Sequence, residues 1–189
     1  MNNILKLIFL VVIVSISIAQ ISVKSTPKSL MFDDINQNVP NINLNTIDIE
    51  ALLIEDEIEQ MDKSIPFRFG TPIEVNYNLD NSGEWIETEL GRIWRISITS
   101  KSAYSMNLIY DRFILPEGAE MFVYDENMNT ILGAFTSANN KDYYTFSTAP
   151  TKGDMTIIEY FEPYDVEFNG ELSISHVIHG YKDVFFNDS

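Results

Sequence analysis

Hydrophobic and polar residues alternate in a series of short segments that begins near Pro66. The pattern is plainest at residues 73–79, where every second side chain is apolar. A repeat of two places alternate side chains on one face, which predicts a half-buried β-strand. Further segments of this kind, or short apolar runs, lie at residues 94–98, 104–110, 121–124, 131–135, 143–148, 155–161 and 172–178.

Turn-forming residues separate these segments, and no long helical pattern interrupts them. Asn81-Ser82-Gly83 and Pro116-Glu117-Gly118 are two such turns. About eight short strands at regular spacing are typical of an all-β protein. The sequence therefore predicts an antiparallel β-sandwich or jelly-roll-like domain at residues 66–186, followed by a short tail at residues 187–189.

The first residues carry the pattern of an exported protein. A short polar start with Lys6 precedes an apolar run, and the small residues Ser17 and Ala19 occupy the −3 and −1 positions of a cleavage site. This predicts a signal peptide at residues 1–19, cleaved after Ala19. A spanning helix needs ~20 apolar residues, which this run does not provide. We therefore expect a secreted, extracellular or periplasmic protein with no membrane attachment after cleavage.

The segment at residues 20–65 is rich in asparagine and poor in large apolar clusters, which predicts a flexible lead-in. Within it, residues 48–62 hold seven acidic residues and no basic one. A short amphipathic helix is expected there, with Thr46 or Asp48 as its N-cap. Its apolar side would consist of Ile49, Leu52, Leu53 and Ile58. The acidic run is interpreted as a solvated face, with a docking strip for a basic partner as the alternative.

The composition narrows the range of partners. The 189-residue chain has 28 acidic residues against 12 Lys and Arg, a formal charge of −16. This balance argues against a nucleic-acid partner and against an anionic membrane surface, because both are bound by clustered Lys and Arg. The chain has no cysteine, which excludes disulfides, thiolate zinc sites and a Cys nucleophile. No cofactor is predicted.

Ser175, His176 and His179 raise the hypothesis of a small hydrolase. A catalytic triad needs a nucleophile, an imidazole and a carboxylate that converge in space. Neighbouring residues of a strand point to opposite faces, so Ser175 and His176 are not expected to pair. Two histidines without a third ligand also hold zinc poorly, so both are interpreted as structural residues.

Two further groups of residues are candidate binding sites. Asp125, Asn127 and Asn129 are spaced like the start of a calcium loop, but the EF-hand pattern requires Gly and Glu where Thr130 and Thr136 stand. We interpret the segment as a hairpin turn, with calcium as a weak alternative. Aromatic residues could form a sugar-stacking platform or fill the core. They are Trp85, Trp94, Tyr104, Tyr110, Tyr143 and Tyr144.

Six motifs, in this order, resemble a known kind of module. They are Ile65-Pro66-Phe67-Arg68-Phe69-Gly70, residues 91–96, residues 103–108, residues 115–124, residues 133–140 and His179-Gly180-Tyr181-Lys182. The sequence resembles the N-terminal, non-catalytic region of secreted trypsin-like serine proteases of the lysyl endopeptidase type. That family's protease domain follows this region, so the resemblance implies a fragment of a precursor or a free-standing copy of the module. No catalytic residue of the family has a counterpart here.

The resemblance implies a propeptide-like role, with a trypsin-like protease domain as partner, in cis or in trans. If that partner cleaves after lysine, Lys182 becomes a candidate processing site. The leading hypothesis is therefore a non-enzymatic pro-region of a lysyl endopeptidase-like precursor. The alternatives are an extracellular carbohydrate- or surface-binding module, and a small hydrolase that uses His176 or His179.

Overall fold

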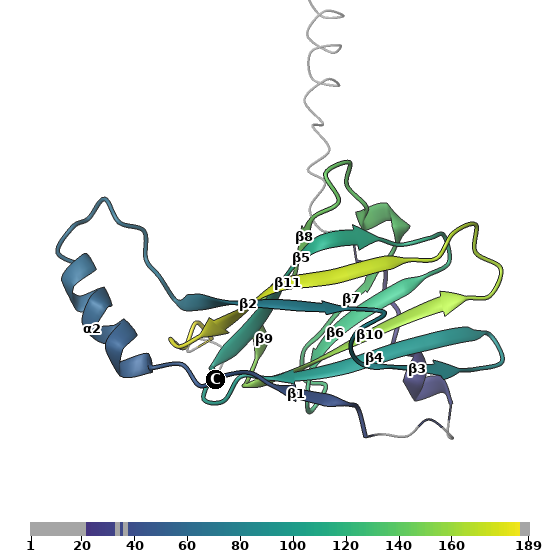
Figure 1. Cartoon of the computed structure of the whole chain (residues 1–189), viewed down its shortest axis with the longest axis horizontal. Helices are drawn as coiled ribbons and strands as arrows, with labels where there is room; N and C mark the ends of the chain where they lie inside the picture. Colours follow the sequence, from purple (N-terminus) through teal and green to yellow (C-terminus); the bar gives the residue numbers. More distant parts are fainter. Residues whose placement is uncertain (1–21, 33–34, 36–37, 186–189) are drawn as a thin grey trace, which may run out of the picture.

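Two β-sheets packed face to face make up most of the molecule (Figure 1). The structure is a computed structural model and describes residues 22–32, 35 and 38–185. It confirms the predicted all-β sandwich. The predicted signal peptide and its cleavage site at Ala19 lie outside the described residues. Within the described ranges, no helix is long and apolar enough to cross a membrane.

The first sheet has the strand order β1-β4-β10-β6-β7, and β3 also pairs with β4. Its strands are β1 (Asn41–Asn43), β3 (Glu84–Glu87), β4 (Gly91–Thr99), β6 (Glu120–Asp125), β7 (Ile131–Phe135) and β10 (Met155–Pro163). All the pairs are antiparallel except β1 with β4, which is parallel. The short helix η1 (Lys28–Met31) precedes this sheet, and η2 (Ser137–Asn139) follows β7.

The second sheet has the order β2-β11-β5-β8, and β9 also pairs with β5. Its strands are β2 (Gly70–Asn78), β5 (Ser105–Ile114), β8 (Phe146–Ser147), β9 (Thr151–Lys152) and β11 (Glu171–Gly180). Every pair in it is antiparallel. β2 is the first strand of this sheet along the chain and β11 is the last. The two strands pair, so segments that are distant in the sequence lie side by side. The helix α2 (Ile49–Glu59) stands at the end of the sandwich where β2 begins (Figure 1).

The core lies between the sheets and consists of the alternating residues that the sequence pattern marks. Leu108 and Tyr110 of β5 face Ile96 of β4 and Ile158 of β10, and all four are buried. Burying a side chain of this size contributes ~1.5–3 kcal/mol relative to leaving it exposed. Aromatic rings close one side of the core, where Phe113 and Phe146 stack with centroids 4.2 Å apart.

The strands differ from the prediction in their number and in the direction of one strand pair. The described residues form eleven strands rather than about eight, because β1, β3 and β9 are short pairings without a clear repeat of two. The segment predicted as a strand at residues 143–148 pairs only at Phe146 and Ser147. The parallel pairing of β1 also departs from the purely antiparallel sandwich.

The described part of the predicted flexible lead-in packs against the first sheet instead. Val23 exchanges two backbone hydrogen bonds with Ala134, of 3.0 and 2.9 Å. Ile35 is buried beside Ile93 and Phe161 on the outer face of that sheet. The sandwich therefore begins well before residue 66, because the outer face of the first sheet is apolar and needs a cover.

A buried carboxylate also holds this N-terminal segment, the cover of the first sheet, in place. Glu159 of β10 is fully buried and accepts hydrogen bonds from the backbone N–H and the hydroxyl of Ser29, of 2.9 and 2.5 Å. The Tyr124 hydroxyl donates a third, of 3.2 Å. A buried carboxylate needs such partners, since an unsatisfied one is costly.

We expect Ser29→Ala to lower the free energy of unfolding by about 1–3 kcal/mol, because the Glu159 carboxylate would lose a buried donor. Denaturant unfolding of the whole chain measures the change. Ser64→Ala, in an exposed turn, is the matched control and should change the stability little. Equal stability of the two variants would contradict this account of the cover.

Candidate functional site

The junction between α2 and the sandwich is organised around one buried acid. The Asp48 carboxylate caps the helix by accepting a hydrogen bond from the Ala51 N–H, as the sequence predicts. Only half of the predicted apolar side faces the body: Ile49 and Leu52 are half-buried, whereas Leu53 and Ile58 are exposed by 43% and 65%. Asp56 takes the inward position, with only 4% of its surface exposed. The helix therefore docks through polar contacts, which its sequence pattern does not reveal.

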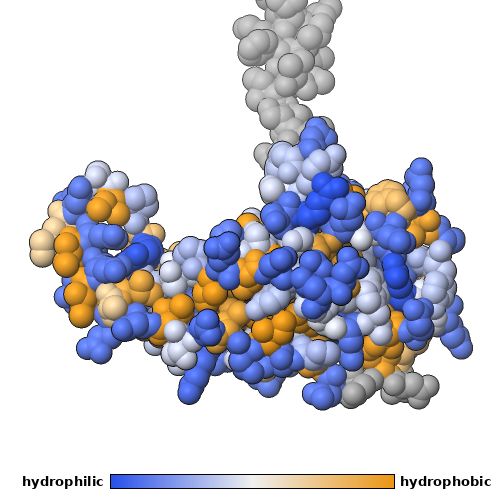
Figure 2. Space-filling view, viewed as in Figure 1, coloured by the Kyte–Doolittle hydropathy of each residue, from blue (hydrophilic) through white to orange (hydrophobic). Residues whose placement is uncertain are grey.

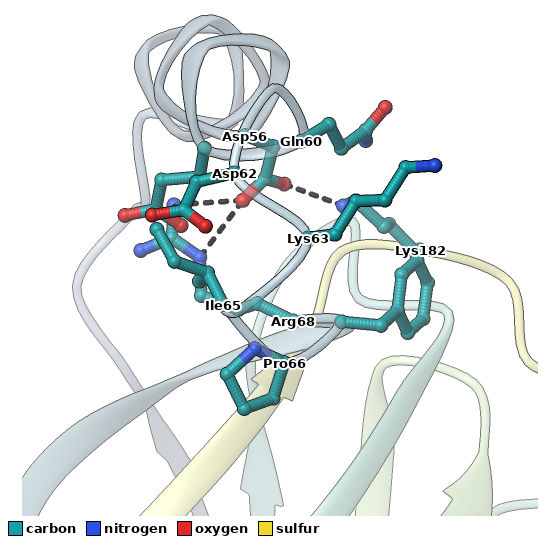
Figure 3. Close-up of a pocket in the computed structure, with 10 residues that line it drawn as sticks. Asp56, Gln60, Asp62, Lys63, Ile65, Pro66, Arg68 and Lys182 are labelled. Carbon is teal, nitrogen blue, oxygen red and sulfur yellow. Dashed lines mark hydrogen bonds and ion pairs between the residues drawn. The ribbon is translucent and has the colours of Figure 1, made fainter.

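Asp56 binds three side chains that lie just before the start of β2 or just after the end of β11, and Figure 3 shows two of them, Arg68 and Lys182. Arg68, just before β2, donates its Nε–H to Oδ1 at 2.9 Å. Beyond β11, the Tyr181 hydroxyl donates to Oδ2 at 2.9 Å, and the Lys182 ammonium lies 2.6 Å from the same oxygen. One carboxylate thus ties the helix to the two strands β2 and β11.

The electrostatics of the junction follow from these contacts. Burial alone would raise the pKa of the Asp56 carboxyl, but hydrogen bonds from Lys182, Tyr181 and Arg68 outweigh it and hold the pKa below its ordinary value of 3.8. Burial and the bond to Asp56 raise the pKa of Tyr181 to about 12. Asp56 is therefore ionised at neutral pH and Tyr181 keeps its proton.

A cavity of about 160 Å³ lies beside this acid, between the helix and the segment that returns to β2. Figure 3 shows Asp62, Lys63 and Ile65 at its rim. The Lys182 ammonium, which closes one side, lies 4.8 Å from the centre of the Phe67 ring. The predicted processing residue Lys182 is thus engaged by a carboxylate and a ring, and its side chain is 18% exposed.

A second hollow lies at the opposite end of the second sheet, where β2 and β5 end and β11 begins. It has a volume of about 190 Å³, and Asn78, Asp80, Arg112 and Glu171 contribute polar groups to its lining. The Arg112 Nε–H donates to Glu171 at 2.6 Å. This bond raises the pKa of Arg112 and lowers that of Glu171, so both are charged at neutral pH.

An exposed aromatic ring adjoins this hollow through Arg112. The guanidinium carbon lies 4.5 Å from the centre of the Tyr144 ring, and the ring is 46% exposed. Tyr144 has a φ of 59°, a conformation unusual for a bulky residue, and its carbonyl accepts a 2.8 Å bond from the Phe113 N–H. Its neighbour Tyr143 is 68% exposed. Strained backbone that is fixed by neighbouring bonds is frequent at binding sites.

The six aromatic residues do not form one platform. Trp94 and Tyr110 are buried in the core, and Trp85 is half-buried beneath the Arg92 guanidinium. Tyr104 is exposed but lies at the other end of β5 from the Tyr144 hollow. Of the predicted set, only Tyr144 is exposed and contacts a residue that lines this hollow.

The histidines do not assemble a triad among the described residues. His179 is buried, its Nδ1 lies 2.7 Å from the Ser100 hydroxyl, and its Nε2 has no partner. Burial lowers its pKa below the ordinary 6.5, so it is neutral at pH 7. No carboxylate bonds to His179 or to His176 in the part of the chain that is described. The geometry thus gives the hydrolase hypothesis no support.

One expectation about these residues is wrong. Ser175 and His176 were expected on opposite faces, yet the Ser175 hydroxyl lies 3.0 Å from Nδ1 of His176. The cause is a β-bulge, because Ile174 and His176 pair with the consecutive residues Tyr110 and Ile109 of β5. The extra residue breaks the strict alternation that the prediction assumes.

Asp125 occupies the predicted hairpin turn between β6 and β7. Its buried carboxylate accepts backbone N–H bonds from Asn127, Asn129 and Thr130. Both carboxylate oxygens are therefore used within the turn. No group of three or more acidic or histidine side chains that could hold a metal ion is found among the described residues.

Comparisons with known proteins place the chain only loosely. No family model matches it. A solved structure similar to it is a family 35 carbohydrate binding module from an environmental isolate, with 19% sequence identity and a TM-score of 0.24. The similarity covers 63% of this chain and 90% of that module. A likeness of this size carries no argument about function.

Sequence reasoning missed Asp56 and the pair Arg112–Glu171. A buried acid within an acidic run has no local signal, since its partners lie 12 and more residues away. The adjacent Tyr143 and Tyr144 offered only a partial signal, because the sequence marks them among six aromatic residues that could form a platform or fill the core.

We expect Asp56→Asn to lower the free energy of unfolding by about 1–3 kcal/mol at pH 7, because charged donors would face a neutral amide. The folded pKa lies below 3.8, so the contribution of the carboxylate is complete above that pH and is lost as pH falls through the folded value. The difference in unfolding free energy between wild type and variant should therefore shrink below about pH 4. Denaturant unfolding at pH 7 and pH 3 tests this, with exposed Asp165→Asn as the control. A gap that stays constant with pH would refute it.

Proposed function

We propose that this chain is a non-catalytic recognition module of the β-sandwich class. Two observations support the proposal: the histidines have no carboxylate partner among the described residues, and Tyr143 and Tyr144 are exposed. A binding function needs a shaped surface with convergent polar groups and no activated nucleophile.

The first candidate ligand is a carbohydrate or a glycan-bearing surface. The observation behind this candidate is the exposed ring of Tyr144, held by Arg112 beside a polar hollow. Sugars present apolar C–H faces that stack on aromatic rings and hydroxyls that bond to charged and amide groups. Asn78, Asp80 and Glu171 offer such groups within the same hollow.

The second candidate is the pro-region of a secreted lysyl endopeptidase-like serine protease. The observation that favours it is the place of Lys182, directly after the last strand and bound to Asp56. A protease that cleaves after lysine would meet this residue at the edge of the sandwich. The contact with Asp56 would then make processing depend on whether α2 is docked.

For the first candidate, we expect Tyr144→Asn to weaken binding to a recognised soluble polysaccharide at least about tenfold, because the stacking surface is lost. Asparagine tolerates the left-handed backbone, so the loop is retained. Affinity electrophoresis in gels that contain single polysaccharides measures binding. Tyr104→Asn, an exposed tyrosine at the far end of β5, is the matched control. Equal losses in both variants, or no retardation by any polysaccharide, would contradict the proposal.

For the second candidate, the chain is expected to act on a lysine-specific trypsin-like protease domain. A molar excess should lower the activity of the folded enzyme, or raise the yield of active enzyme refolded from denaturant. Hydrolysis of a small lysyl amide substrate measures both effects. A Leu108→Asp chain, with a charge in the core, controls for nonspecific protein effects. The absence of both effects would exclude this candidate.

A further inference from the structure

The helix α2 exposes an apolar ridge that has no partner in the described chain. Ala51, Ile54 and Ile58 recur at helical spacing, and Met61 continues the row in the turn after the helix. Ile54, Ile58 and Met61 are exposed by 55%, 65% and 85%. Figure 2 shows hydrophobic side chains over this end of the molecule. We call Ala51, Ile54, Ile58 and Met61 the α2 ridge.

The ridge points outward because the opposite side of the helix is already used. Ile49, Leu52, Asp56 and Glu59 have the same 3-4-3 spacing and are the less exposed positions. The Asp56 contacts hold that side against β2 and β11. The outward side of the helix is therefore free to contact a partner. In helix-in-groove recognition, exposed apolar residues at this spacing bind in the partner's groove.

Acidic side chains border the ridge on both flanks. At 100° per residue, Glu55 lies on one flank and Glu50 and Glu57 lie on the other, and all three are exposed. Complementary charge requires a partner groove lined with apolar residues and bordered by Lys or Arg. A second copy of this chain is disfavoured by its own charge of −16, and an anionic membrane is disfavoured in the same way.

We propose that the α2 ridge docks into an apolar, Lys- and Arg-bordered groove on a trypsin-like protease domain. This inference rests on the second candidate function and adds the surface through which the partner is held. Ile54 and Ile58 act as the anchors, and the acidic flanks speed the encounter.

The test measures binding of the full chain to a lysine-specific trypsin-like protease domain whose nucleophilic serine is replaced by alanine. The variant Ile54→Gln/Ile58→Gln should bind at least about tenfold more weakly, because the anchors are removed without a change of charge. Leu90→Gln is the matched control, since Leu90 is 60% exposed in the turn between β3 and β4. Circular dichroism and denaturant unfolding check that the variants keep the helix and the fold.

A second arm tests the charged flanks. Glu50→Gln/Glu57→Gln should slow association several-fold at low salt and have little effect at 1 M salt, where such charges are screened. Equal association rates of variant and wild type at low salt would refute the role of the flanks.

The outcomes separate the docking surface from the function on which it rests. If the wild-type chain does not bind the protease domain, both the second candidate and the ridge proposal fail. If it binds and the ridge variant binds equally well, only the ridge proposal fails. Ridge-dependent binding to phosphatidylglycerol or phosphatidylcholine vesicles, or ridge-dependent dimers in sedimentation, would overturn the protease assignment in favour of those occupants.

Discussion

The ionised carboxylate of Asp56 determines which side of the helix α2 faces solvent. A buried charge is tolerated only when it is paired and hydrogen-bonded, and Arg68, Tyr181 and Lys182 supply that pairing from the segments just before β2 and just after β11. Once the acid faces inward, the period of the helix leaves Ile54 and Ile58 facing solvent. The direction of the apolar ridge is thus a consequence of one polar contact.

The two candidate surfaces lie at opposite ends of the same sheet. β2 begins beside α2 and ends beside the hollow near Tyr144, and a strand of its length spans about 30 Å. Ligands at the two ends would not compete for space. A module of this form could hold a glycan-bearing surface at one end while a protein partner occupies the other, so the two candidate functions are compatible.

The sequence predicts the sandwich because its core residues alternate, as at Leu108 and Tyr110, and that repeat depends only on neighbours in the chain. It does not predict the features that depend on distant partners. The partners of Asp56 lie beside β2 and β11, with Tyr181 125 positions away, and the bulge at Ser175 depends on how β11 pairs with β5. Of the candidate site, the sequence marks Tyr143 and Tyr144 only among aromatic residues that could form a platform or fill the core. Arg112 and Glu171 become neighbours only through the pairing of β5 with β11.

The cover over the first sheet has a consequence for how the chain folds. Ser29 meets Glu159 across 130 positions, and Asp56 meets Tyr181 across 125. Contacts of such long range close late and slow the folding reaction. In a chain emerging in order from its N-terminus, the segment around Ser29 and Ile35 would have no sheet to cover until β10 has been delivered. The lead-in at residues 20–65 would have to remain soluble meanwhile, and its asparagines and acidic side chains favour contact with water over collapse.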